Sequence, residues 1–275
     1  MMTLADASAF FDRTEVLDAF TGAALFYGQV DPYDESKRDA GSAYRRVMSV
    51  APGTPMPAHR SVVIHGQTWL VGAGEVDGHA TAHRAKYTLQ AASPTQVRTL
   101  AQLLAGAAVP QVYSGVEWFK DQKEVEASSQ VSAQFLAYLA DGTVVEKAQV
   151  ITCAGRNYLV VGSRPTPSGF MVAVTAQLEY PVTAVSVTGR VFDPVAGSAV
   201  DASTVTVQGM RVRWQTLFEY THQRAERYQE GDDALVLPTA TPVVAGTRIE
   251  LGTEVWQVLD VSSVYGALAA HVRRA

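Results

Sequence analysis

The sequence VVIHGQTWLVG, residues 62–72, links two short apolar runs through a glycine and returns with a tryptophan three positions later. Two further stretches follow the same plan, VITCAGRNYLVVG at 150–162 and IELGTEVWQVLD at 249–260. Glycine provides the positive φ that a hairpin tip needs, and a large aromatic side chain can anchor the core of a small barrel. The recurrence therefore predicts a hairpin built around each of three aromatic residues. The turn glycines are Gly66, Gly155 and Gly252, and the aromatic residues are Trp69, Tyr158 and Trp256.

The spacing between the three aromatic residues is roughly 90 residues, which is the size of a small β domain. A second glycine follows each hairpin, at Gly78, Gly169 and Gly266. The first and third copies also share a preceding strand and proline-rich loop, so we expect two related modules with a third, more divergent module between them. The expected domains are 1–92, 93–180 and 181–275.

Most of the remaining sequence consists of short β-branched runs separated by Gly, Pro, Asp and Asn, which is typical of antiparallel strands and turns. Helices do not alternate with strands, so a parallel sheet is not expected. Short helices are predicted over residues 4–20 and 93–104, the second with Ser93 as its N-cap and Gly106 as its end. Residues 214–228 fit a helix or a strand followed by a helix. The expected fold class is mainly β: two or three small antiparallel barrels or sandwiches with a few short helices.

Composition excludes several classes of protein. The 275 residues carry a net charge of −5 and 47% hydrophobic residues, without the clustered Lys and Arg of a nucleic-acid-binding surface. The single cysteine, Cys153, cannot form an intrachain disulfide or a cysteine-based zinc site. The first twenty residues lack the basic start of a signal peptide, and no apolar run approaches the length of a membrane span. We expect a protein made in the cytoplasm.

The stretch LVGAGEVDG, residues 70–78, superficially resembles a phosphate-binding turn. A dinucleotide-binding turn needs the spacing GxGxxG at the start of a helix, with an acidic residue about 20 positions later. The sequence has GxGxxxG, no convincing helical pattern follows, and no P-loop motif occurs. We therefore interpret GAGEVDG as a loop and expect no cofactor.

Other candidate residues fit solvated positions better than catalytic ones. His79 and His83 have the spacing of two metal ligands on a helix but no third ligand nearby, so we expect surface histidines and no metal. Asp31, Asp34 and Glu35 suit a solvated loop, and Asp232 with Asp233 a solvated turn. A Ser-His-Asp set remains possible because its members can be distant in sequence. The basic end HVRRA fits a frayed terminus that could contact a phosphate or an acidic partner. We predict no catalytic, cofactor-binding or metal site.

The C-terminal part, from about Trp214 onward, resembles the head–tail joining, or head-closure, proteins of tailed bacteriophages. The residues that carry the resemblance are Gly252, Trp256 and Val258, followed by Gly266 and the last run ALAAHVRR. One extra residue stands between Gly252 and Trp256. The first copy, with Gly66, Trp69 and Val71, has the usual spacing. Members of that family usually hold one such barrel, so two or three in one chain is a departure.

The resemblance implies a structural virion protein of the phage neck or collar rather than an enzyme. It implies a homo-oligomeric ring of six or twelve copies that joins portal to tail and is assembled in the host cytoplasm. Rings need contacts between two different faces of a subunit, and strand addition at an open sheet edge is one way to make them. Net negative charge suits a channel through which DNA passes without specific binding.

Three other functions remain open. A tail-tube, tail-terminator or tail-tip protein would also be rich in β structure and form a ring. A carbohydrate- or protein-binding β module would expose the aromatic residues. A hydrolase on a β scaffold would need a cleft with ionisable groups of perturbed pKa.

Overall fold

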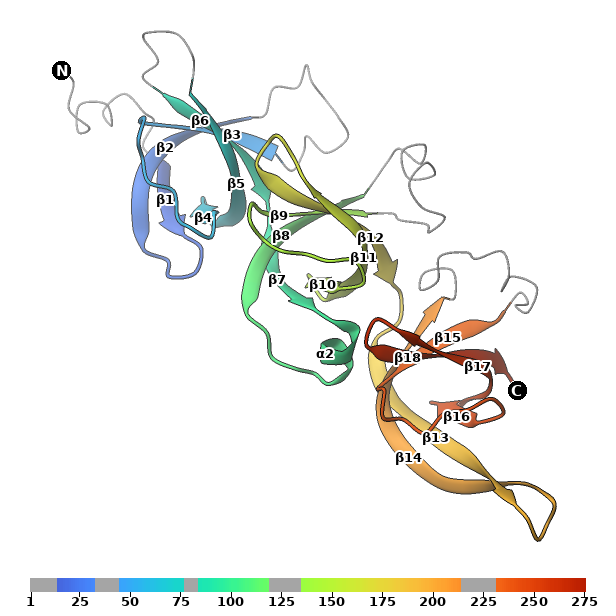
Figure 1. The fold of residues 1–275 in the computed structure, drawn as a ribbon. Coiled ribbons are helices and arrows are strands. Elements are labelled where there is room, and N and C mark those ends of the chain that lie inside the picture. The colour runs from blue at the N-terminus through green and yellow to red at the C-terminus, as the bar shows by residue number, and fades with distance from the viewer. Residues whose placement is uncertain (1–13, 33–44, 77–83, 119–134, 214–230) are drawn as a thin grey trace.

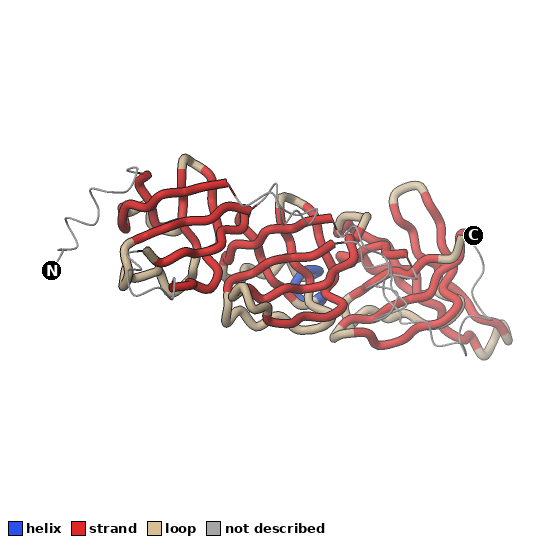
Figure 2. Tube along the Cα trace, turned by 90° about the horizontal axis from the view of Figure 1, so that it is seen from above, coloured by secondary structure: helices blue, strands red, loops and turns tan. Residues whose placement is uncertain are grey.

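The computed structural model describes residues 14–32, 45–76, 84–118, 135–213 and 231–275. These residues form three closed six-stranded antiparallel barrels that follow one another along the chain. Figures 1 and 2 show the barrels arranged end to end as an elongated body. The expected mainly β fold of several small antiparallel barrels is confirmed.

All three barrels have the same strand order. Numbered within a barrel, the hydrogen-bonded neighbours run 1-2-3-6-5-4, and strand 4 closes against strand 1. The middle barrel, expected to be divergent, shares this order with the other two. The repeat is therefore one of topology, beyond the short sequence pattern that suggested it.

Each barrel contains six strands. Barrel 1 contains β1 (Thr14–Asp18), β2 (Ala24–Pro32), β3 (Arg45–Val50), β4 (Ser61–Ile64), β5 (Gln67–Val76) and β6 (Ala85–Ala91). Barrel 2 contains β7 (Ser93–Arg98), β8 (Gln111–Trp118), β9 (Phe135–Ala140), β10 (Val150–Cys153), β11 (Arg156–Pro165) and β12 (Phe170–Leu178). Barrel 3 contains β13 (Val182–Asp193), β14 (Ser198–Arg213), β15 (Asp233–Leu237), β16 (Arg248–Leu251), β17 (Glu254–Val264) and β18 (Ala267–Arg274).

The three aromatic residues occupy one position in three barrels. Trp69 pairs across the hairpin with Val62, Tyr158 with Ile151, and Trp256 with Ile249. Each of the three packs in the core of its own barrel, with Tyr158 and Trp256 buried and Trp69 half-buried. The prediction that they are interior anchors of comparable barrels is confirmed.

The extra residue before Trp256 has a simple structural reason. Each hairpin has a two-residue turn: His65–Gly66, Ala154–Gly155 and Gly252–Thr253. Glycine stands second in the first two turns and first in the third, where its φ is +62°. These are the positions that type I′ and type II′ turns favour for glycine. The turn length is constant, and only the position of the glycine shifts.

Both helix predictions that fall on described residues need correction. Thr14–Asp18 forms strand β1, so the helix predicted over 4–20 is wrong there, and residues 4–13 lie outside the described residues. Ser93–Arg98 forms strand β7, and the helix α2 covers only Leu100–Leu104. Residues 214–228 lie outside the described part of the chain.

The N-cap of α2 is Thr99 rather than Ser93. The Thr99 hydroxyl accepts a hydrogen bond from the Gln102 amide, and the Gln102 side chain accepts one from the Thr99 amide. This capping box was readable in the sequence as T-x-x-Q and starts the helix six residues later than predicted. Gly106, at φ +62°, follows the C-cap Ala105, as expected for the end of a helix.

Candidate functional site: the junctions between barrels

Outside the barrel cores, buried side chains and hydrogen bonds between segments far apart in the sequence gather at the two junctions between neighbouring barrels. The first junction joins barrels 1 and 2 through a single linker residue, Ala92, whose amide donates to the Thr68 carbonyl at 3.0 Å. The second joins barrels 2 and 3 through Glu179, Tyr180 and Pro181. Each junction has its own buried cluster of side chains.

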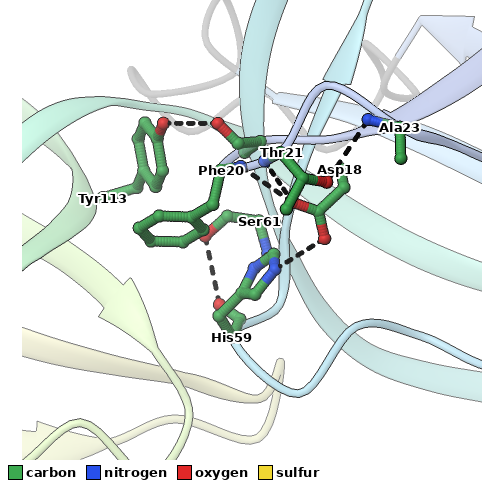
Figure 3. A network of polar contacts seen from close by, with 8 residues as sticks. Asp18, Phe20, Thr21, Ala23, His59, Ser61 and Tyr113 are labelled. Atoms are coloured by element: carbon green, nitrogen blue, oxygen red, sulfur yellow. Dashed lines mark hydrogen bonds and ion pairs between the residues drawn. The ribbon is translucent and has the colours of Figure 1, made fainter.

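The first junction is rich in aromatic side chains. Its buried cluster consists of Leu70, Ala92, Tyr113, Tyr138, Phe170 and Val172. Phe20, from the turn after β1, meets the ring of Tyr113 edge-on with 5.0 Å between ring centroids. The Tyr113 hydroxyl donates to the Ala19 carbonyl at 2.7 Å (Figure 3). A turn of barrel 1 is therefore held on barrel 2 by both packing and a hydrogen bond.

The same turn is stabilised by Asp18. One carboxylate oxygen accepts hydrogen bonds from the amides of Phe20 and Thr21, each at 2.8 Å. The other oxygen lies 2.9 Å from Nε2 of His59 (Figure 3). The bond from the Thr21 amide is the main cause that lowers the pKa of Asp18 to about 2, with His59 contributing. Asp18 is therefore ionised near neutral pH and fixes the turn that carries Phe20.

Asp18, His59 and Ser61 bring together the residue types of a hydrolytic triad without its geometry. Nδ1 of His59 accepts from the Ser61 backbone amide at 3.1 Å, so the proton of the neutral ring is on Nε2, facing Asp18. The Ser61 hydroxyl instead donates to the His59 carbonyl. A nucleophilic serine must give its proton to the imidazole. This set stabilises a loop and does not activate a nucleophile.

Backbone groups of the two barrels also approach closely at the first junction. The Ala73 amide of β5 donates to the Ser168 carbonyl in the β11–β12 turn at 2.7 Å. A Cβ atom at Gly72 would lie 2.3 Å from that carbonyl oxygen, and one at Gly169 would lie 2.3 Å from the Ala73 nitrogen. Only glycine allows this approach. Strand β5 continues to Val76, so the interpretation of GAGEVDG as a loop is wrong for Gly72–Val76. Residues 77 and 78 lie outside the described residues.

Arg45 adds a polar contact across the first junction. Its guanidinium donates to the Tyr138 hydroxyl of barrel 2 at 2.9 Å and to the side-chain oxygen of Gln90 in barrel 1 at 3.2 Å. Charged donors make stronger hydrogen bonds than neutral ones, especially where water is largely excluded. The guanidinium therefore ties the two barrels in a fixed orientation.

The second junction is mainly apolar. Helix α2 of barrel 2 buries three leucines against the strands of barrel 3. The residues of this cluster are Leu100, Leu103, Leu104, Val150, Leu159, Leu178, Met210, Val212, Ala234, Val236, Ala267 and Ala269. Because burial of apolar surface is non-directional, this cluster contributes free energy more than it fixes orientation.

Two arginines of β14, Arg211 and Arg213, contact the linker of the second junction. The guanidinium of Arg211 lies over the rings of Tyr180 and Trp256, 4.6 and 4.8 Å from their centroids. It also forms ion pairs with Asp233 at 2.6 Å and with Glu254 at 3.4 Å. Arg213 pairs with Glu179 of the linker at 2.8 Å. The linker is therefore attached to barrel 3 by a stacked ring and an ion pair.

An open cleft of about 600 Å³ lies beside α2 at the second junction. Arg98, Arg156 and Asn157 line it from barrel 2, and Gln208 lines it from barrel 3. The Nε atom of Arg98 is buried there without a hydrogen-bond partner. Within the described residues that line it, no nucleophile is placed beside a base. The cleft could hold a small polar molecule, but it has no arrangement typical of a hydrolase.

Asp232 and Asp233 do not form the solvated turn that we predicted. The Asp232 side chain is 3% exposed and pairs with His271 at 2.9 Å and with Arg273 at 2.7 Å. Asp233 begins β15 and is buried. Burial lowers the pKa of His271, although Asp232 opposes the effect. The predicted solvated turn was wrong because the partners of Asp232, His271 and Arg273, come from β18 and are 39 and 41 residues away in sequence.

The C-terminal run HVRRA is also not frayed. Residues 271–274 lie in strand β18, where Arg273 pairs with Asp232 and Arg274 pairs with Glu254 at 3.1 Å, and the Ala275 amide donates to the Val255 carbonyl. Asp31, predicted in a solvated loop, lies in β2 and accepts a hydrogen bond from the Gln29 side chain. Cys153 is a buried free thiol. His79, His83, Asp34 and Glu35 lie outside the described residues.

In the described part of the chain, no group of three or more His, Cys, Asp or Glu side chains could hold a metal ion. None of the helices described is long and apolar enough to cross a membrane. Comparisons of the chain with protein-family models, with curated proteins and with solved structures each gave no match.

Proposed function

We propose that this protein is a structural joining component of a tailed-phage virion, in the neck, head-closure or collar region between portal and tail. The observation that carries the proposal is the series of three barrels of one topology, joined end to end by structured junctions. An elongated body with structured junctions could hold two partner proteins at a fixed distance and orientation. The resemblance of the C-terminal barrel to head–tail joining proteins is the reason for placing such a spacer in the phage neck.

In this proposal the protein acts as a ring of six or twelve copies that contacts portal or adaptor and tail proteins. DNA passes through the ring without specific binding, which the net charge of −5 favours. A positively charged lumen would contradict this part of the proposal. The working protein is located in the virion after assembly in the host cytoplasm, and it is not an enzyme.

Burial of the aromatic residues bears on the ligand-binding alternative. A carbohydrate-binding module would use exposed aromatic faces, yet Tyr158 is 5% and Trp256 2% exposed, and Trp69 is half-buried against the core of barrel 1. A tail-tube, tail-terminator or tail-tip ring remains the second candidate, because the same barrels would serve it equally well. The two ring proposals differ in the protein that the ring binds.

Electron microscopy of the purified full chain, alone and mixed with portal rings or tail tubes, tests the proposal. A ring that caps the portal supports the neck, and one that caps the tube supports the tail alternative. A chain that forms no ring and binds neither partner overturns both. The genes beside this one give a simple independent check, since a neck protein is expected next to portal, terminase or tail genes.

A further inference from the structure

In barrels 1 and 2, the segment that connects the first strand of the barrel to its second strand contacts the next barrel along the chain. In barrel 1 this connection is residues 19–23, which place Phe20 on Tyr113 of barrel 2. In barrel 2 it is residues 99–110, which include α2 and pack against barrel 3. The equivalent connection of barrel 3 therefore occupies the place from which a further barrel would be contacted.

In barrel 3 this connection is a projecting β ribbon. The β13–β14 pairing continues from Arg190–Asp201 to Asp193–Ser198. The neighbouring strand β16 pairs with β13 only as far as Thr188, and β15 pairs with β14 only from Met210. Residues 189–202, which we call the arm, thus extend beyond the barrel as two strands alone. Figure 1 shows the arm pointing away from barrels 1 and 2.

The tip of the arm repeats the turn that docks barrel 1 on barrel 2. Asp193 accepts hydrogen bonds from the amides of Val195 and Ala196, as Asp18 does from those of Phe20 and Thr21. The Gly197 amide donates to the Asp193 carbonyl at 2.9 Å, and the Gly22 amide donates to the Asp18 carbonyl at the same distance. Within the turn, Val195 therefore has the position that Phe20 has in its own turn, and it is 94% exposed at the tip of the arm.

The surface that would receive this tip is present on barrel 1. Tyr113, which receives Phe20, pairs with Pro94, the second residue of its barrel's first strand. Tyr27 pairs with Glu15 in the same way in barrel 1. Tyr113 is 8% exposed because the turn and the buried cluster of the first junction cover it, whereas Tyr27 is 51% and its neighbour Leu25 38% exposed. Barrel 1 thus carries an uncovered equivalent of the Tyr113 position.

We propose that the arm tip of one copy docks on the Tyr27 surface of barrel 1 in a second copy, continuing the contact seen within the chain. Val195 packs on the Tyr27 ring, and the Tyr27 hydroxyl donates to the Pro194 carbonyl, as Tyr113 does to Ala19. The contact joins two different surfaces of the same chain, so repetition forms a ring or an open filament. The ring form of this inference rests on the proposed function.

The contact between copies is smaller than the junctions within the chain. Phe170 and Val172 surround Tyr113 with apolar side chains, whereas the strand of barrel 1 equivalent to β12 carries the exposed Lys86. We therefore expect association that is reversible and dependent on concentration. Copies would stay separate until they are collected at an assembly site.

Sedimentation velocity on the full chain over a concentration series tests the contact. Wild type is expected to associate, and Val195→Asp and Tyr27→Asp are each expected to weaken association about tenfold or more. Val144→Asp, at a 76%-exposed valine of barrel 2, is the matched control and should associate as wild type does. Circular dichroism establishes that each variant is folded.

Mixing the two variants provides the decisive result. The Val195→Asp chain keeps its Tyr27 surface and the Tyr27→Asp chain keeps its arm, so the mixture should form a one-to-one dimer that cannot grow. A wild type that remains monomeric at millimolar concentration overturns the proposal, as do variants that associate normally or a mixture that forms no dimer. Rings that persist in Val195→Asp overturn the arm contact but leave the proposed function standing. A dimer without rings or portal binding overturns the proposed function instead.

Discussion

The first junction adds directional hydrogen bonds and close backbone contacts to its aromatic cluster, whereas the second relies mostly on leucines and other apolar side chains. A one-residue linker and the Ala73–Ser168 hydrogen bond leave barrels 1 and 2 little freedom. A three-residue linker and an open cleft accompany the apolar cluster around α2. Hydrogen bonds are directional and apolar burial is not, so the first junction sets geometry and the second contributes stability.

The largest expected effect falls on the apolar junction. Leu100→Ala removes a fully buried leucine and should lower the free energy of unfolding by about 2–5 kcal/mol. Scanning calorimetry should then resolve an earlier transition for barrel 3. Leu139→Ala is the control, because Leu139 is equally buried but lies in the core of barrel 2. If both variants behave alike, α2 does not couple the two barrels.

The next largest effect on stability is expected at Gly169, where the backbones of barrels 1 and 2 approach closely. Gly169→Ala places a methyl group 2.3 Å from the Ala73 nitrogen and should cost about 1–3 kcal/mol more than Gly155→Ala. Gly155 is the matched control, because its φ is +74° against +73° and nothing lies within 4 Å of its Cβ position. Urea unfolding of the two variants measures the difference. Equal free energies of unfolding for the two variants would mean that the first junction can separate without loss of stability.

A single hydrogen bond gives a smaller effect. Tyr113→Phe keeps the ring that packs on Phe20 but removes the donor to the Ala19 carbonyl. We expect the free energy of unfolding to fall by about 1 kcal/mol. Tyr265→Phe, at a 41%-exposed tyrosine in barrel 3, is the control and should change little. Hydrogen exchange at residues 19–23 should rise only in the first variant.

Mild acid should affect barrel 3 before the first junction. Burial lowers the pKa of His271 in the folded chain below its unfolded value, so the unfolded state binds more protons below about pH 6.5. Stability should therefore decline as pH falls below about 6.5. His271→Gln should flatten this part of the profile of unfolding free energy against pH, and an unchanged slope would contradict the assignment.

The first junction should weaken only in strong acid. Because the folded pKa of Asp18 is about 2, below its usual 3.8, its contribution is complete above about pH 4 and is lost as pH falls toward 2. Asp18→Asn keeps an oxygen acceptor for the turn amides and should remove this dependence. Acid unfolding followed by Trp fluorescence measures it. A variant profile identical to wild type between pH 4 and 2 would show that another group is responsible.

The sequence pattern was sufficient for the hairpins because their determinants are local. A glycine within a two-residue turn and an aromatic residue on the returning strand encode a turn and a core anchor within about ten residues. The capping box of Thr99 and Gln102 was equally local and was missed because Ser93 and Pro94 looked like a better helix start. The β7 strand overrides that local preference by pairing with both β8 and β10.

The sequence by itself determined that this chain is mainly β, that a hairpin recurs three times, and that Trp69, Tyr158 and Trp256 are interior residues. Only the tertiary structure decided that the barrels close, that Asp232 is buried with His271, and that the turns after β1 and β13 share one hydrogen-bond pattern. Periodicity and turn chemistry act over a few neighbouring residues. Barrel closure, buried ion pairs and junctions instead depend on residues that are tens of positions apart and meet only when the chain has folded.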